Sequence, residues 1–197
     1  MLNALGYTVP LAFASGLNLY ATVAVLGLCS RYGLVTLPPQ FHAFDNPLVI
    51  GFAVALYLVE FVADKIPWVD SLWDAVHTIV RPIGGAFVAV TALGDATPAA
   101  TTLAALVGGS VAMTTHLTKA GTRAAANTSP EPFSNWVLSF GEDILAVGIS
   151  YAALQHPILA LTIAIALLLI ILAFATVLIR ALRRRFARPP VGAVSRT

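Results

Sequence analysis

Acids, bases and a histidine are concentrated between residues 60 and 81, where the chain reads EFVADKIPWVDSLWDAVHTIVR. The ionisable residues of this segment are Glu60, Asp64, Lys65, Asp70, Asp74, His77 and Arg81. The rest of the chain is strongly apolar, since 58% of all residues are hydrophobic and only 10% are charged. Charged side chains are costly in hydrocarbon and usually face a polar cavity or a partner there. We therefore expect this segment to line a polar path inside an apolar protein.

Four of these residues form one stripe on a predicted helix. Asp70, Asp74, His77 and Arg81 fall within about 60° of one another at 100° per residue. The spacing Asp74-x-x-His77 lets one helix offer a carboxylate and an imidazole to the same metal, although two ligands alone do not complete a site. The stripe is explained either by a cation or proton site that lines a path, or by an amphipathic segment whose charges pair with one another.

Two further acids lie one turn apart at the end of the preceding apolar segment. Glu60 is the deeper one, and a buried carboxylate needs a partner or a proton. We interpret Glu60 as a candidate proton carrier. Asp64 is followed directly by Lys65. The alternative for that pair is a solvated helix end.

A basic stripe follows later in the chain. Lys119, Arg123 and Asn127 recur at helical spacing after His116. Such a stripe is able to bind an anion or to gate a path, and it is equally able to neutralise the acidic stripe.

Polar residues inside two other apolar segments complete the candidate path. Glu142 and Asp143 are adjacent acids in the middle of an apolar segment, and Asn135 shares a face with Glu142. Asn18 belongs to a polar string with Ser15 and Thr22 on one helical face. We assign Asn18 and Asn135 to the polar lining of the path.

Long apolar runs predict an integral membrane protein with an all-α fold, a polytopic transmembrane helical bundle of about six segments. We expect segments at 5–30, 47–64, 69–94, 98–126, 134–154 and 157–182, with the third kinked or broken at Pro82. These form a single transmembrane domain over 1–182. Residues 183–197 form a basic tail that we expect to be cytoplasmic and disordered. The single cysteine, Cys29, excludes an intrachain disulfide.

The charge distribution predicts the orientation. Residues 180–197 carry six arginines and no acid. Six spans with the N- and C-termini both cytoplasmic place most basic residues inside. The tail lacks the aromatic platforms of a nucleic-acid binder, so we expect no nucleic-acid partner.

A shift of 93 residues aligns two halves weakly, which suggests two inverted three-helix repeats of the kind found in transporters.

Three stretches resemble one bacterial family. They are ASGLNLYATV (14–23), VEFVADKIPWVDSLWDAVHTIVRPIGGA (59–86) and HLTKAGTRAAANTSPEPFSNWVLSFGEDILA (116–146). They are similar to the domain-of-unknown-function family numbered 4126, over most of residues 5–155. The resemblance implies a bacterial integral membrane protein and supplies no substrate and no functional residues.

These observations favour a small transporter or channel in the bacterial cytoplasmic membrane that moves an ion or small polar solute. The alternatives are a membrane enzyme acting on a lipid or phosphorylated headgroup, and an assembly partner without turnover. The sequence contains no GxSxG, HExxH, Walker or GxGxxG motif, so an enzyme is the less favoured class. We expect no cofactor. The expected partners are the lipid bilayer, the transported species and further copies of the same chain.

Overall fold

The computed structural model describes residues 2–128 and 133–186, and every regular element in this part of the chain is helical. The elements are α1 (Leu2–Leu17), α2 (Leu19–Arg31), the short 3-10 helix η1 (Pro39–Phe44), α3 (Pro47–Ala63), α4 (Pro67–Leu93), α5 (Pro98–Ala126), α6 (Phe133–Gln155) and α7 (Pro157–Phe186). The all-α prediction is confirmed. The last five α-helices begin and end close to the predicted segment boundaries.

Helix starts follow local sequence signals. Proline is the first residue of α3, α4, α5 and α7, where its missing N–H costs nothing and its fixed φ suits a helix. Asn46 caps α3 by accepting from the N–H of Leu48 at 2.8 Å. Thr97 caps α5 by accepting from the N–H of Ala100 at 3.3 Å. These caps satisfy N–H groups that have no partner within the helix.

The first predicted segment, 5–30, is not a single span. The helix stops at Leu17, and Asn18 adopts an extended conformation with φ of −151° and ψ of 101°. Its side chain then caps α2 by accepting from the N–H of Ala21 at 2.9 Å. The 16 residues of α1 and the 13 of α2 measure about 24 Å and 20 Å, shorter than a hydrocarbon core of about 30 Å.

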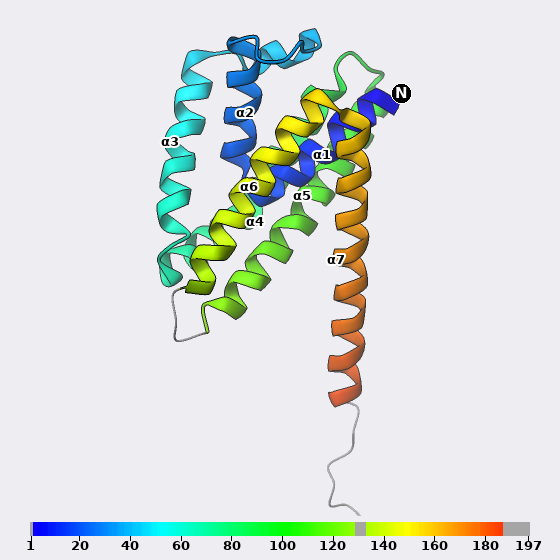
Figure 1. Cartoon of the computed structure of the whole chain (residues 1–197). Helices are drawn as coiled ribbons and strands as arrows, with labels where there is room; N and C mark the ends of the chain where they lie inside the picture. Colours follow the sequence, from blue (N-terminus) through cyan, green and yellow to red (C-terminus); the bar gives the residue numbers. More distant parts are fainter. Residues whose placement is uncertain (1, 129–132, 187–197) are drawn as a thin grey trace, which may run out of the picture.

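The two short helices form a V-shaped pair, which we name the re-entrant pair for its backbone course alone (Figure 1). α1 starts at the end of the bundle that holds η1, runs to the middle, and α2 returns to the same end. At that end Gly6 packs against Pro157, the first residue of α7. At the tip, Gly16 packs against Ala112 and Thr115 in the middle of α5. The start of α1 and the end of α7 therefore lie at opposite ends of the bundle. The side of the membrane that each terminus faces stays a prediction.

The sequence predicts a kink or a break at Pro82; the break is absent, and the kink stays a prediction. α4 continues through Pro82 as one helix of 27 residues. It packs very closely on α5, where a Cβ on Gly85 or Gly108 would overlap the Cβ of Ala112 or Ala89. Small residues at a helix–helix contact permit this approach in membrane proteins. The discontinuity of the fold therefore lies in the first segment and not in the third.

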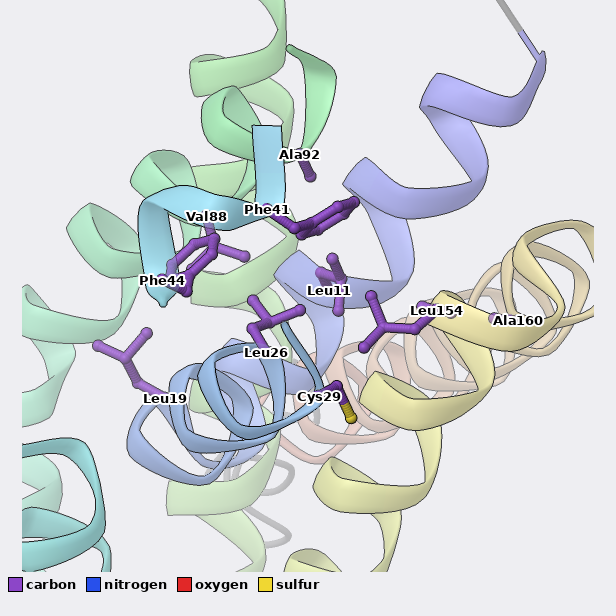
Figure 2. Packing of buried hydrophobic residues seen from close by; sticks show 11 residues of the cluster. Leu11, Leu19, Leu26, Cys29, Phe41, Phe44, Val88, Ala92, Leu154 and Ala160 are labelled. Atoms are coloured by element: carbon purple, nitrogen blue, oxygen red, sulfur yellow. The ribbon is translucent and has the colours of Figure 1, made fainter. Parts of the chain in front are cut away.

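A hydrophobic core fills the end of the bundle that contains η1. Phe41 and Phe44 project from η1 between α1, α2 and α4, and they are almost fully buried (Figure 2). Cys29 lies in the same cluster as a buried free thiol. Leu154 extends the cluster to α6. This core holds the outer part of the re-entrant pair in place.

Three helices in the described part of the chain are long and apolar enough to cross a membrane: α4, α6 and Pro157–Ala181 of α7. α1, α2 and α3 are shorter apolar helices. α7 leaves the bundle over its last turns (Figure 1). The basic tail predicted to begin at residue 183 starts inside α7, and residues 187–197 lie outside the described residues.

The inverted repeat stays a prediction, and its 93-residue shift places the broken pair α1–α2 over the continuous α5.

Candidate functional site

Nine buried charged side chains come together from α3, α4, α5, α6 and the turn after α3. We name them the buried charge network: Glu60 and Asp64 at the end of α3, Asp70, Asp74 and Arg81 of α4, Lys119 and Arg123 of α5, and Glu142 and Asp143 of α6. All nine were candidate path residues in the sequence. Asp64 is 1% exposed, so the alternative of a solvated helix end is wrong.

Arg81 joins three parts of the fold. Its Nη2 donates to Glu60 Oε1 at 2.7 Å, and its Nη1 lies 3.8 Å from Asp74 Oδ1. The same Nη1 donates to the backbone oxygen of Gly16 at 3.1 Å and to His116 Nδ1 at 2.8 Å. The guanidinium thus faces the carboxyl end of α1, where the helix dipole favours a cation.

Lys119 is the second cation at the tip of the re-entrant pair. Its Nζ lies 3.2 Å from Glu60 Oε1, 3.2 Å from Asp64 Oδ2 and 3.6 Å from Glu142 Oε2. It also donates to the backbone oxygen of Leu17 at 3.2 Å. The two final carbonyl groups of α1 are therefore each satisfied by a buried cation.

Arg123 connects the acids of α3, α4 and α6. Its Nη2 lies 2.6 Å from Asp64 Oδ2, and its Nε lies 3.2 Å from Glu142 Oε2 and 3.7 Å from Asp70 Oδ1. Nη1 donates to the backbone oxygen of Asn135 at 3.1 Å. The basic stripe thus pairs with the acidic residues, which was one of the two interpretations of the sequence.

Two asparagines extend the network toward the ends of α5 and α6. Asn127 donates to Asp70 Oδ2 at 3.0 Å and to the backbone oxygen of Pro67 at 3.2 Å. Asn135 in turn donates to Asn127 Oδ1. Both amides therefore orient the acidic residues of α4 rather than standing free.

The network contains more acids than bases. Six buried carboxyl groups face three buried cations, an excess of three among the described residues. Lys65 adds a half-buried amine at the edge, where it donates to Ser139 Oγ at 3.3 Å. Six carboxyl oxygens are buried without a hydrogen-bond partner in this part of the chain, and three of them, Glu60 Oε2, Asp64 Oδ1 and Asp143 Oδ2, also have no ion-pair partner there within 4.0 Å. Unbalanced buried carboxylates require protons or bound cations.

His77 lies on the predicted stripe but turns toward α2. Its Nδ1 hydrogen-bonds the backbone oxygen of Trp73 at 2.7 Å, and its Nε2 hydrogen-bonds Tyr20 Oη at 3.1 Å. Within the residues that the structure describes, no group of three or more His, Cys, Asp or Glu side chains could hold a metal ion. The Asp74–His77 spacing therefore brings no third ligand of these types with it.

Several contributors could not be recognised in the sequence. The phenol of Tyr20 contacts His77, and the carbonyls of Gly16 and Leu17 bind Arg81 and Lys119. Tyr20 looked like one more aromatic residue in an apolar run, and backbone carbonyls carry no sequence signal. The available hint was Gly16-Leu17-Asn18, a small residue and a strong N-cap residue in the middle of an apolar segment.

A polar cavity of about 230 Å³ adjoins the network between α4 and α5. Its polar lining comes from Asp70, Ser71, Asp74, Thr78 and Arg123. A larger groove of about 570 Å³ lies between α2, α3 and α4 and is lined almost wholly by apolar side chains. The small cavity is therefore the one that offers access to the buried charges.

Apolar helices around a buried charge network define the class as a polytopic membrane protein. The family model described as "Domain of unknown function (DUF4126)" matches residues 5–177, so the chain belongs to this family. The match includes most of α7, beyond the motifs on which the sequence resemblance rested. The search of curated proteins and the search of solved structures gave no match.

Proposed function

We propose that this protein is a small membrane transporter or channel that moves a cation, or a small polar solute carrying one, through the buried charge network. The observation that carries the proposal is the excess of three buried carboxyl groups at the tip of a re-entrant helix pair. Buried charge that serves only packing is usually balanced, because an uncompensated charge costs several kcal/mol, of the order of 3–5.

The broken pair α1–α2 supports a transport role. Discontinuous helices that meet near the middle of the membrane form the ion and substrate sites of many transporters, because their free ends direct backbone dipoles at the bound species. Here the carbonyl end of α1 meets Arg81 and Lys119, and Asn18 at the break contacts Asp143. If Arg81 or Lys119 exchanged its carboxylate partners, its hydrogen bond to the carbonyl end of α1 would change as well.

The path that we propose begins at the polar cavity beside Asp70 and Asp74. It continues past Glu60, Asp64 and Glu142, which share the cations Arg81, Lys119 and Arg123. His77 borders it from the α2 side. Lys119, Arg123 and Asn127 act as the gate, because each must exchange partners before an ion passes.

The proposed setting is the cytoplasmic membrane of a bacterium, with the end of α7 in the cytoplasm and the start of α1 on the other side. This orientation keeps Lys65 and the arginines at the end of α7 inside, as the positive-inside rule requires. It gives five crossings, α3 to α7, with α1–α2 as a re-entrant pair. We also propose assembly into a homo-oligomer, since the many exposed apolar side chains of α6 and α7 suit contact with lipid and with further copies.

Flux into proteoliposomes tests the transport proposal. Wild type is compared with Asp74→Asn and Glu142→Gln over monovalent cations, divalent metals, protons and small anions. Asp95→Asn is the matched control, because Asp95 lies exposed in the turn between α4 and α5. We expect flux that is lost in Asp74→Asn or Glu142→Gln and kept in Asp95→Asn. Absence of flux across the whole panel, with folded protein, would contradict the proposal.

The pairing of every buried cation favours one rival, an assembly partner in which the charges only stabilise the fold. Under that alternative Glu142→Gln destabilises the protein, and there is no transport to lose. A variant that keeps its stability but loses flux excludes this alternative.

A further inference from the structure

Asp143 differs from the other acids of the buried charge network. The other five each lie within 4.0 Å of a cationic nitrogen. No such ion pair is found for Asp143 among the described residues, although only 6% of the residue is exposed. Its Oδ1 accepts from Asn18 Nδ2 at 3.0 Å, and its Oδ2 has no hydrogen-bond partner in the described chain.

The orientation of the Asn18 amide is fixed by the fold. Asn18 Oδ1 accepts from the N–H of Ala21 at the start of α2, so Nδ2 must be the atom that faces Asp143. A donor at that position requires Asp143 Oδ1 to be an acceptor. A proton on this carboxyl group therefore resides on Oδ2, the oxygen that has no partner.

Charged and titratable groups face Asp143 from two other elements and from the turn after α3. The groups that act on it electrostatically, or on which it acts, are Tyr57, Glu60, Asp64, Lys65 and Lys119. Lys119 is already shared by Glu60, Asp64 and Glu142. Lys65 is held elsewhere, by the backbone oxygen of Phe61 at 2.8 Å and by Ser139. Asp143 is thus a buried acid among other acids, with the nearby amines engaged by different partners.

This geometry suits a proton better than a metal ion. A metal cation needs several oxygen ligands, about six or more for calcium or magnesium. Asp143 Oδ2 has no hydrogen-bond partner in the described chain, and no group of three or more His, Cys, Asp or Glu side chains there could hold a metal ion. A proton needs only one oxygen, and it removes the charge that a buried carboxylate cannot otherwise neutralise.

We propose that Asp143 is the proton-binding site of the path and that the transported cation is the proton. This inference rests on the proposed transport function. Hydronium transfers a proton to Asp143 Oδ2, forming an O–H bond, and becomes water. On the other side of the path this O–H bond breaks and the proton passes to a water molecule. Release leaves a carboxylate, which the flexible Lys65 side chain is placed to neutralise, since Ser139 lies one helical turn before Asp143. Asn18 is a positioning residue that keeps Oδ2 as the protonated oxygen.

The test uses Asp143→Asn in proteoliposomes with a pH-sensitive dye inside and a potassium gradient with valinomycin to set the voltage. Asparagine keeps an oxygen that can accept from Asn18, so the fold is retained, as unchanged thermal unfolding would verify. We expect proton flux about 100-fold below wild type, or at background, because the proton has lost its carrier. Asp95→Asn should match wild type. Asp143→Glu should retain part of the flux, because it keeps a carboxyl group.

Infrared difference spectra provide a second measurement that does not depend on flux. Titration of wild type with acid should produce carbonyl stretches of protonated carboxylic acids, and Asp143→Asn should lack one component of these bands, seen when its difference spectrum is subtracted from that of wild type. If the subtracted spectrum contains no carboxylic-acid component, or if proton flux in this variant equals that of wild type, the assignment to Asp143 is wrong. If wild type moves another cation but not protons, the transport function stands and the proton inference fails. If wild type moves nothing while the band is still lost in the variant, the transport function fails and Asp143 remains a proton site without transport.

Discussion

Arg123 is the side chain on which the most distant acids of the network depend. It lies within ion-pair distance of Asp64, Asp70 and Glu142, which come from three different segments of the chain. Its own side chain is 1% exposed, so none of these pairs is weakened by water. The strength of these ion pairs therefore depends on the burial of Arg123.

Replacing Arg123 with glutamine should destabilise the fold by about 3–5 kcal/mol, because it leaves buried carboxylates without a cation. Unfolding in detergent, followed by circular dichroism, measures the loss. The control is Arg31→Gln, since Arg31 pairs with Asp45 at 3.3 Å on the surface and its side chain is 42% exposed. That variant should change stability by no more than about 1 kcal/mol. Equal losses in the two variants would contradict the role assigned to Arg123.

At the scale of elements, the break between α1 and α2 places the tip of the re-entrant pair at the network. Asn18 both caps α2 and donates to Asp143, whereas Asn46 performs only the capping role for α3. The two asparagines are therefore a natural pair for comparison. Asn46 only caps the start of α3, whereas Asn18 caps the start of α2 and also contacts Asp143.

Asn18→Ala should cost about 1 kcal/mol from the lost cap, as should Asn46→Ala. Only Asn18→Ala should also lower proton flux, because only Asn18 positions Asp143. Flux and unfolding measured on the two variants separate these effects. A fall in flux in both, or in neither, would show that the break does not position the acid.

The packing of α4 on α5 gives a further prediction at this scale. A Cβ on Gly85 would overlap Ala112, whereas Gly51 on α3 has no atom within 4 Å of that position. Gly85→Ala should therefore destabilise the protein by about 1–3 kcal/mol through overpacking. Gly51→Ala should be neutral or slightly stabilising, since alanine favours a helix over glycine by about 0.5–1 kcal/mol. Thermal unfolding of both variants tests this prediction. A Gly85→Ala variant as stable as wild type would mean that α4 and α5 lie farther apart than the structure shows.

For the whole molecule, the re-entrant pair decides where the two ends lie. A continuous first span would return both termini to one side, whereas α1–α2 begins and finishes at the same end of the bundle. The turn between α6 and α7, at His156, lies at that end too, because Gly6 packs against Pro157. The end of α7 lies at the opposite end.

Labelling of single cysteines in intact cells tests this arrangement, with Cys29→Ser removing the one native thiol. His156→Cys and an N-terminal epitope tag should be reached from the same side of the membrane. Arg184→Cys, near the end of α7, should be reached from the other side. An N-terminal tag that shares its side with Arg184→Cys would restore the continuous first span.

The sequence by itself determined the helical class, the starts of α3, α5 and α7, and the residues that form the buried charge network. These follow from local properties, namely apolar length, proline at the first helical position, and charges repeating at helical spacing. Periodicity could also tell that the acidic and basic stripes each occupy one face of a helix. It could not tell which stripes meet, because that depends on the tilt and order of helices far apart in the chain.

Only the tertiary structure decided that Asn18 interrupts the first segment and that Arg81 and Lys119 bind the carbonyl end of α1. It also decided that Asp143 has no ion pair with any residue that the structure describes. Asn18 appeared as one more polar position on a helix face, since the same residue type suits a buried lining and an N-cap. Glu142 and Asp143 are neighbours in sequence, yet they point about 100° apart, so one meets Arg123 and the other meets Asn18. The partner of each acid is therefore set by the direction of its side chain, and on this difference rests our proposal that Asp143 binds a proton.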